Sequence, residues 1–149
     1  MNGSSPLAPM PDSISKPSTG RPLRIIYADD LQQLRELMQM VLSREGHRLD
    51  TFENGRLALN RLSQDLTAYD LLITDHHMPE MNGLELVENV RQLHFPGKIL
   101  VFSSELSQEV TNAYMAMHVD RVLPKPVLPS VLRQTLVELF SAVPVSGPG

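Results

Sequence analysis

Five side chains with useful chemistry each stand at or just beyond the end of an apolar run in this sequence. Asp29 and Asp30 follow LRIIYA, Asp75 follows YDLLIT, Ser103 closes KILVFS, and Lys125 comes shortly after DRVL. Carboxylates held close together repel one another, and a divalent cation removes that conflict. Magnesium binds through one or two carboxylates, keeps several waters and takes phosphate oxygens in its remaining positions. These residue types favour a magnesium-dependent phosphoryl-transfer site, provided that the fold brings them together.

Asp75 is the residue of this set that can react covalently. It stands in YDLLITDHHMPEMNG, residues 69 to 83, where an aliphatic run ends on a carboxylate, two histidines and a proline. A carboxylate can accept a phosphoryl group as an aspartyl phosphate, with Lys125 offsetting negative charge and the Ser103 hydroxyl donating a hydrogen bond. Purely structural interpretations stay open for each residue taken alone. Asp29 and Asp30 can cap a helix, and Asp75 can belong to a turn.

The composition limits the class of protein. The 149 residues include no cysteine and are 42% hydrophobic, so the chain can bury one core and has neither disulfides nor thiolate metal sites. No apolar run approaches the roughly 20 residues that cross a bilayer, and the N-terminus lacks a secretory signal. We therefore expect a cytoplasmic protein with no membrane partner. The formal net charge of -4 and the scattered Lys and Arg argue against direct nucleic-acid binding.

The two ends of the chain differ in composition from its middle. Residues 1–22 are rich in Ser, Pro and Gly without apolar periodicity, which predicts a disordered tail. Residues 143–149 repeat this composition on a smaller scale and are predicted to be a flexible C-terminal tail. One folded domain is expected over residues 23–142, and because no second block of composition follows, we expect no output domain.

Between the tails, the hydrophobic pattern alternates between the periods of strands and helices. Runs of apolar and β-branched residues predict strands at 23–28, 47–52, 69–74, 98–103 and 120–123. Apolar residues at helical spacing predict helices over 31–46, 54–66, 83–93, 107–118 and 129–140. Five strand–helix units with short connections favour an α/β fold, a doubly wound five-stranded parallel sheet with helices on both faces.

The reactive side chains all fall at one edge of this predicted sheet. Ligands of open α/β sheets bind beyond the carboxyl ends of the strands. Asp29 and Asp30 end the first predicted strand, Asp75 the third and Ser103 the fourth, and the fifth leads directly to Lys125. The sequence therefore predicts that these five residues converge on one rim.

With these residues in this order, the chain resembles the receiver domain of two-component response regulators, and specifically the stand-alone, single-domain members of the chemotaxis type. The similarity runs from about Arg24 to Leu139. Its motifs are Ala28-Asp29-Asp30, Asp75-His-His-Met-Pro-Glu-Met-Asn-Gly, Ser103 at a strand end and Lys125-Pro126. Each is weak alone, and the four in this order are a specific signal. The resemblance implies the flavodoxin-like (βα)5 fold, with strand order 2-1-3-4-5.

The resemblance also implies a ligand set for Mg²⁺. Asp75 aligns with the phosphoacceptor, Asp30 with a direct metal ligand, and Asp29 with the acid that reaches the metal mainly through water. The backbone carbonyl of His77 takes the position that usually completes the protein ligands.

Two further residues receive roles from the resemblance. Lys125 matches the lysine that pairs with the acceptor and then with the phosphoryl group, and the Lys125–Pro126 bond is expected to be cis, an isomer that is accessible before proline. Ser103 matches the switch hydroxyl that moves towards the phosphoryl oxygen.

The sequence departs from the family pattern at several positions. Val122 stands where the family usually has an aromatic residue coupled to the switch hydroxyl, so switching by an inward-swinging ring is not expected. His77 and Glu105 are bulky residues at positions that tune the lifetime of the phosphoryl group. Glu105 can orient the attacking water, or it can pair with His77 and exclude it, and the sequence leaves both open. His118 replaces a usual glycine at the end of a helix.

Two side chains near the rim need separate interpretation. The adjacent imidazoles of His76 and His77 suit zinc or copper. Neighbours on a loop rarely point the same way, however, so no transition-metal site is expected. Tyr114 is expected to pack in the core or on the surface of its helix.

These observations predict a stand-alone response regulator of a two-component phosphorelay. It takes a phosphoryl group onto Asp75 from a phosphohistidine on a sensor histidine kinase or phosphotransfer protein, catalysing its own phosphorylation and dephosphorylation. Its signal then passes to an unknown downstream protein. Two alternatives stay open. One is a phosphorylation-independent, receiver-like binding module. The other is an aspartyl-phosphate hydrolase of the haloacid dehalogenase type, which needs a second Asp where this chain has His77.

Overall fold

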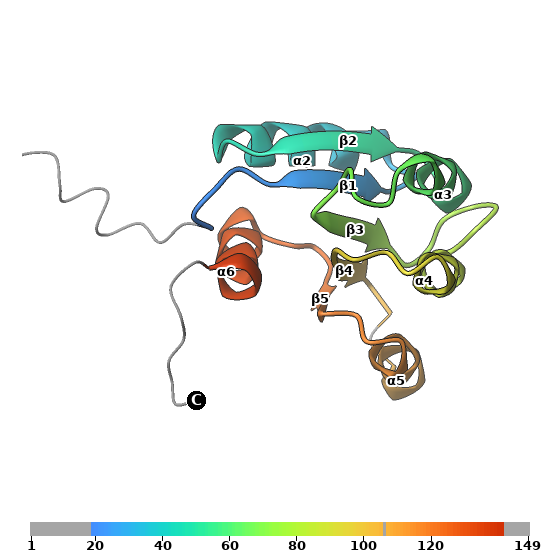
Figure 1. Cartoon of the computed structure of the whole chain (residues 1–149). Helices are drawn as coiled ribbons and strands as arrows, with labels where there is room; N and C mark the ends of the chain where they lie inside the picture. Colours follow the sequence, from blue (N-terminus) through green and yellow to red (C-terminus); the bar gives the residue numbers. More distant parts are fainter. Residues whose placement is uncertain (1–18, 106, 142–149) are drawn as a thin grey trace, which may run out of the picture.

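The computed structural model describes residues 19–105 and 107–141 and has alternating strands and helices (Figure 1). Strands β1 to β5 form one parallel sheet in the order β2-β1-β3-β4-β5. Their bounds are Arg24–Ala28, Arg48–Phe52, Leu71–Asp75, Lys98–Ser103 and Arg121–Pro124. The helices are α2 (Gln32–Arg44), α3 (Gly55–Gln64), α4 (Gly83–Gln92), α5 (Gln108–Ala116) and α6 (Pro129–Phe140). The predicted fold class and strand order are confirmed, and each element lies within a few residues of its predicted range.

Helices cover the sheet on both faces, because alternate residues of the buried strands point to opposite sides. On one face, Ile26, Leu72 and Val101 pack in a cluster with residues of α3, α4 and α5. On the other face, Ile25, Ile73 and related strand residues pack in a second cluster with residues of α2 and α6. All five residues of the central strand β3 are buried, so Asp75, its last residue, is held at the carboxyl end of a strand inside the core.

Local signals explain where the helices near the rim begin. The Asn82 side chain accepts a hydrogen bond from the backbone N–H of Glu85, and the Glu85 carboxylate accepts one from the N–H of Asn82. This reciprocal capping box starts α4 directly after the loop that carries Asp75. Asn54 and Ser107 cap α3 and α5 in the same position, each accepting from a backbone N–H three residues on.

Asp70 holds the opposite end of β3. Its carboxylate accepts hydrogen bonds from the backbone N–H of Arg24 at 2.8 Å and from the guanidinium of Arg24 at 3.0 Å. Arg21 forms a further ion pair with it at 3.2 Å. Arg21 lies inside the segment predicted to be a tail, whereas residues 1–18 and 142–149 lie outside the described residues. The predicted domain boundaries therefore stay predictions.

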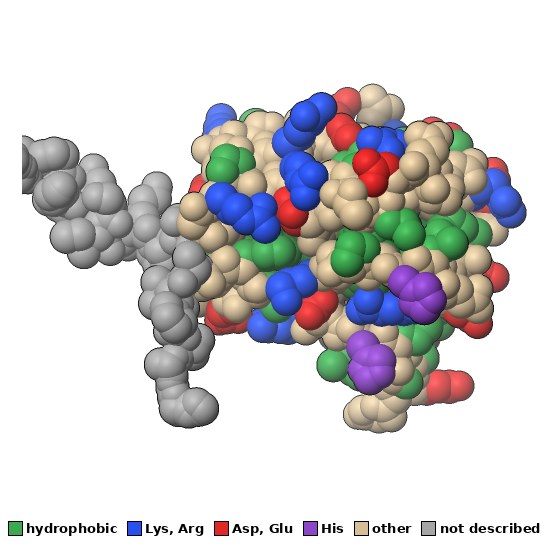
Figure 2. Space-filling view, viewed as in Figure 1, with side chains coloured by type: hydrophobic (Ala, Val, Ile, Leu, Met, Phe, Trp, Pro, Cys, Tyr) green, Lys and Arg blue, Asp and Glu red, His purple; other side chains and the backbone are tan. Residues whose placement is uncertain are grey.

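The described surface carries mixed charge. On the face seen in Figure 2, the Lys and Arg side chains are interspersed with Asp and Glu and form no continuous basic stripe. Among the described residues, no helix combines the length and the hydropathy needed to span a membrane.

Candidate functional site

The parallel register of the sheet brings the predicted residues to one rim. Ala28 of β1 pairs with Thr74 of β3, so Asp29 and Asp75 follow at the same level. Asp75 pairs in turn with Phe102, directly before Ser103, and Ser103 pairs with Pro124, directly before Lys125. Convergence on the carboxyl ends of the strands is thus a consequence of strand order and register.

Three carboxylates and the lysine meet at this rim. Asp29, Asp30 and Asp75 each offer an oxygen within 4.8 Å of the others. The Lys125 ammonium lies 3.1 Å from Asp75 Oδ1 and 3.9 Å from Asp29 Oδ2. Three hard oxygen donors at this spacing, one of them on the exposed Asp30, fit a magnesium ion that keeps some of its waters. The Lys125–Pro126 peptide bond is cis, as predicted.

Asp29 is fully buried and firmly held. Its Oδ2 accepts a hydrogen bond from the Tyr27 hydroxyl at 2.6 Å, and its Oδ1 accepts one from the backbone N–H of Leu31 at 2.9 Å. Burial, and then the charge of Asp29, raises the pKa of Tyr27, which keeps this phenol protonated and donating. The N-cap of α2 is Leu31, which makes no side-chain capping bond. The alternative in which the acidic pair serves to cap this helix is therefore wrong.

Asp75 lies in an environment that disfavours its charge. Burial raises the pKa of its carboxyl group, the negative charge of Asp29 raises it further, and Lys125 opposes both effects. The carboxylate is therefore poised for a cation: a divalent ion would relieve the repulsion from Asp29 that Lys125 relieves only in part.

Ser103 is at the predicted rim, but its hydroxyl has another partner. Its Oγ donates to the backbone carbonyl of Glu105 at 2.8 Å and accepts from the backbone N–H of Glu105 at 2.9 Å. The fully buried hydroxyl thus closes the loop after β4. Its hydrogen bonds lie within this loop, and the predicted approach to Asp75 would require it to leave Glu105.

The two histidines after Asp75 do not diverge, and the expectation that they would is wrong. Their rings meet edge-on with centroids 4.5 Å apart. The Nε2 of His77 lies 3.3 Å from Glu105 Oε1, and the Nε2 of His76 lies 3.8 Å from the same oxygen. His77 and Glu105 therefore lie within ion-pair distance of each other, and their effect on the attacking water stays a prediction.

Tyr114 links α5 to this loop in a way that the sequence did not reveal. Its side chain is fully buried in the core, and its hydroxyl lies 2.6 Å from Nδ1 of His76, which is also buried. A Cβ atom on Gly83 would collide with this hydroxyl and with the backbone carbonyl of Asp75, so the close approach requires glycine. His76 and Tyr114 are 38 positions apart, and no spacing rule connects a histidine after a strand to a tyrosine on a later helix.

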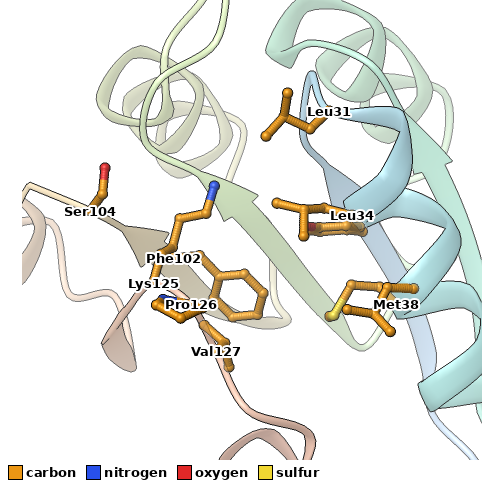
Figure 3. Close-up of a pocket in the computed structure, with 10 residues that line it drawn as sticks. Leu31, Leu34, Met38, Phe102, Ser104, Lys125, Pro126 and Val127 are labelled. Atoms are coloured by element: carbon orange, nitrogen blue, oxygen red, sulfur yellow. The ribbon is translucent and has the colours of Figure 1, made fainter.

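An apolar pocket adjoins the lysine. It has a volume of about 360 Å³ and lies between α2 and the segment after β5 (Figure 3). Leu31, Leu34 and Met38 line one side, and Phe102, Pro126 and Val127 line the other. The pocket also includes Lys125, so an apolar side chain seated here would lie beside the cation that contacts Asp75.

Comparison with known proteins agrees with this arrangement. Residues 25–137 match the family model of the response regulator receiver domain. The chain is 30% identical over 123 residues to the sensory/regulatory protein RpfC of Xanthomonas campestris, and 32% identical over 126 residues to the sensor histidine kinase AruS of Pseudomonas aeruginosa. These matches cover 80% and 82% of this chain but only 17% and 12% of the two relatives.

A solved structure matches both in fold and in length. The chemotaxis protein CheY4 of Vibrio cholerae has a TM-score of 0.73 and 28% sequence identity, and the match covers 79% of this chain and 98% of that one. A CheY-like receiver domain from Methanospirillum hungatei, with a TM-score of 0.75 and 22% identity, shares the fold. The chain belongs to the response regulator receiver domain family of two-component signalling proteins.

Proposed function

We propose that this chain works as a stand-alone response regulator that is phosphorylated on Asp75 by a phosphohistidine of a sensor histidine kinase or phosphotransfer protein. The observation that carries the proposal is the contact of Lys125 with Asp75, 3.1 Å long, beside two further carboxylates at the carboxyl edge of the sheet. Receiver domains generally bind Mg²⁺ at such an acidic pocket. The chain's relatives include a sensor histidine kinase, which supports a donor of that class.

Each residue of the rim has a defined part in this reaction. Asp29, Asp30 and Asp75 and the backbone carbonyl of His77 would hold Mg²⁺, which neutralises charge on the phosphoryl group during transfer. A carboxylate oxygen of Asp75 attacks phosphorus, and the bond from phosphorus to the donor imidazole nitrogen breaks. Lys125 then pairs with a phosphoryl oxygen, while Asp29 stays fixed by Tyr27 and Leu31.

The switch would act through Ser103. Its hydroxyl now bonds the backbone of Glu105, so a move towards a phosphoryl oxygen breaks two hydrogen bonds of the loop between β4 and α5. Once these hydrogen bonds are broken, the loop would reshape the surface of α5, β5 and α6. No aromatic side chain would be needed at position 122, where this chain has Val122. A structure of the phosphorylated protein in which that surface is unchanged would contradict this route.

The donor needs a surface beside Asp75 on which to dock. The apolar pocket between α2 and the segment after β5 supplies one, because it borders Lys125 and is flanked by the exposed side chains of Leu31 and Leu37. An apolar helix face carrying the phosphohistidine would bury these residues while presenting its imidazole to the rim.

The proposal is tested by intact-mass measurement after incubation with acetyl phosphate, with Mg²⁺ and separately with a chelator. The wild type should gain one labile phosphoryl group only when Mg²⁺ is present, and Asp75→Ala should gain none. Asp65→Ala is a matched control, since Asp65 is an exposed carboxylate outside the rim. No gain by the wild type, or an equal gain by Asp75→Ala, would contradict the assignment. Whether the native protein has the mass of the 149-residue chain tests the stand-alone arrangement.

A further inference from the structure

Three potential metal ligands meet beside the phosphorylation site and are not used by it. They are a ring nitrogen of His76, a ring nitrogen of His77 and a carboxylate oxygen of Glu105, all within 4.8 Å of one another. Glu105 Oε1 lies 3.3 Å from the His77 nitrogen and 3.8 Å from the His76 nitrogen. Ligands of a tetrahedral zinc ion, each about 2.0 to 2.2 Å from the metal, are separated by about 3.3 to 3.5 Å. The His77–Glu105 distance thus matches that of two zinc ligands, and the His76–Glu105 distance exceeds it only slightly.

His76 is oriented as a ligand before any metal is bound. Its side chain is only 6% exposed, and its Nδ1 is occupied by the Tyr114 hydroxyl at 2.6 Å. A hydroxyl can accept as well as donate, so the tautomer with its proton on Nδ1 leaves a lone pair on Nε2, the nitrogen 3.8 Å from Glu105 Oε1. Metal-ligating histidines are characteristically held in this way through their second ring nitrogen.

A simple ion pair does not account for the whole cluster. His77 and Glu105 are 63% and 44% exposed, and a pair so exposed contributes about 0 to 1 kcal/mol. It also leaves Nε2 of His76 without a hydrogen bond to Glu105, because the 3.8 Å between the two atoms is too long for one. A metal ion between the three side chains uses all of them.

We propose that His76, His77 and Glu105 form a Zn²⁺ site with its fourth position open to solvent. Two imidazoles and one carboxylate are a recurring ligand set of zinc sites that keep an open position. The site is distinct from the pocket of Asp29, Asp30 and Asp75, whose oxygen donors suit Mg²⁺.

Zinc at this site would oppose activation of the switch. Glu105 would be held by its carboxylate, and its backbone N–H and carbonyl are the present partners of the Ser103 hydroxyl. Bound Zn²⁺ therefore favours the state in which Ser103 stays with Glu105, and the phosphorylated protein should bind Zn²⁺ more weakly than the unphosphorylated protein. This consequence rests on the proposed function, whereas zinc binding itself does not.

The test is calorimetric titration of the full chain with Zn²⁺ in the presence of excess Mg²⁺. The wild type should bind one Zn²⁺ ion at this site, and His77→Ala and Glu105→Gln should each bind it at least about tenfold more weakly. Both side chains are exposed, so neither substitution removes core packing, and circular dichroism checks the fold. Titration with Co²⁺ adds an independent signal, because tetrahedral coordination should give visible absorption bands that both variants lose.

Two controls separate this site from other zinc-binding groups. His94 is exposed with a φ of 63°, a conformation that asparagine tolerates, so His94→Asn removes an imidazole elsewhere and should keep full affinity. Asp30→Asn weakens the acidic pocket and should also keep it. Absence of saturable binding, undiminished affinity in both His77→Ala and Glu105→Gln, or loss confined to Asp30→Asn would overturn the proposal. Since the acetyl phosphate reaction is measured without zinc, its outcome is independent of this one.

Discussion

Asp70 and Asp75 stand at opposite ends of β3, and the structure shifts the pKa values of their carboxyl groups in opposite directions. Hydrogen bonds from Arg24 and Arg21 outweigh burial and hold the pKa of Asp70 well below its usual range. Burial and the charge of Asp29 outweigh Lys125 and raise the pKa of Asp75. At neutral pH the charge of Asp70 therefore stabilises the fold, whereas the charge of Asp75 destabilises it.

The raised pKa of Asp75 predicts that its charge costs stability at neutral pH. The folded protein binds the proton of Asp75 more tightly than the unfolded chain does. Protonation of Asp75 therefore stabilises the fold fully below the unfolded pKa, and this stabilisation is lost as pH rises through the folded pKa. Asp75→Asn should therefore raise the free energy of unfolding at neutral pH, and the difference from wild type should shrink on acidification. Urea unfolding over a series of pH values measures both.

In Asp75→Asn, the Lys125 ammonium still has the Asp29 carboxylate 3.9 Å away, so the substitution does not leave the lysine charge without an acidic partner. A variant less stable than wild type at neutral pH would mean that the Asp75–Lys125 pair outweighs the cost of burial. Glu88→Gln, which changes an exposed carboxylate on α4, provides the reference for the effect of removing one negative charge.

At the level of elements, the sequence predicted best the strands whose apolar runs end at chemically useful side chains. The continuous apolar runs ending at Ala28 and Asp75 identified buried strands, and the parallel arrangement followed from the helices between them. Because parallel strands share one carboxyl edge, these two predictions place Asp29, Asp75 and Lys125 along the same edge. How close they lie depends on the strand order, which the family resemblance implied.

The rest depends on contacts that the sequence pattern does not specify. Serine commonly bonds the backbone two residues on, as Ser103 does with Glu105, but the loop residues alone do not show that this serine does so. The contact of His76 with Tyr114 has no local signal, because it requires the packing of α5 against the rim. The relative direction of the His76 and His77 rings is likewise set by tertiary neighbours, which is why the general expectation for adjacent loop residues failed.

The end of α5 offers a prediction at the level of the element. His118 has a φ of 64°, in the left-handed region, where a side chain costs about 1 to 2 kcal/mol relative to glycine. His118→Gly should therefore have a free energy of unfolding about 1 kcal/mol higher than that of His118→Ala, because both remove the imidazole and only glycine relieves the conformation. Equal values in urea denaturation would show that this helix end tolerates the strained backbone without cost.

For the whole molecule, the acidic pocket predicts a link between metal and stability. A ligand that binds only the folded state stabilises it by about 2.7 kcal/mol at one hundred times its dissociation constant. Mg²⁺ should therefore raise the melting temperature of the wild type, and a chelator should reverse the effect. Asp30→Asn, which removes an exposed ligand and little packing, should respond less in thermal unfolding. An identical response of the two proteins would place magnesium elsewhere.

The order of the strands along the chain determines when, during synthesis, the acidic residues and Lys125 can come together. Asp29 comes from the first strand of the chain, Asp75 from the third, and Lys125 follows the fifth, although β3 lies at the centre of the sheet. During synthesis the ribosome releases the acidic residues long before the lysine. A nascent chain thus exposes Asp75 without the lysine that neighbours it in the folded protein. On the proposed function, phosphorylation of Asp75 would have to wait until β5 has emerged and docked.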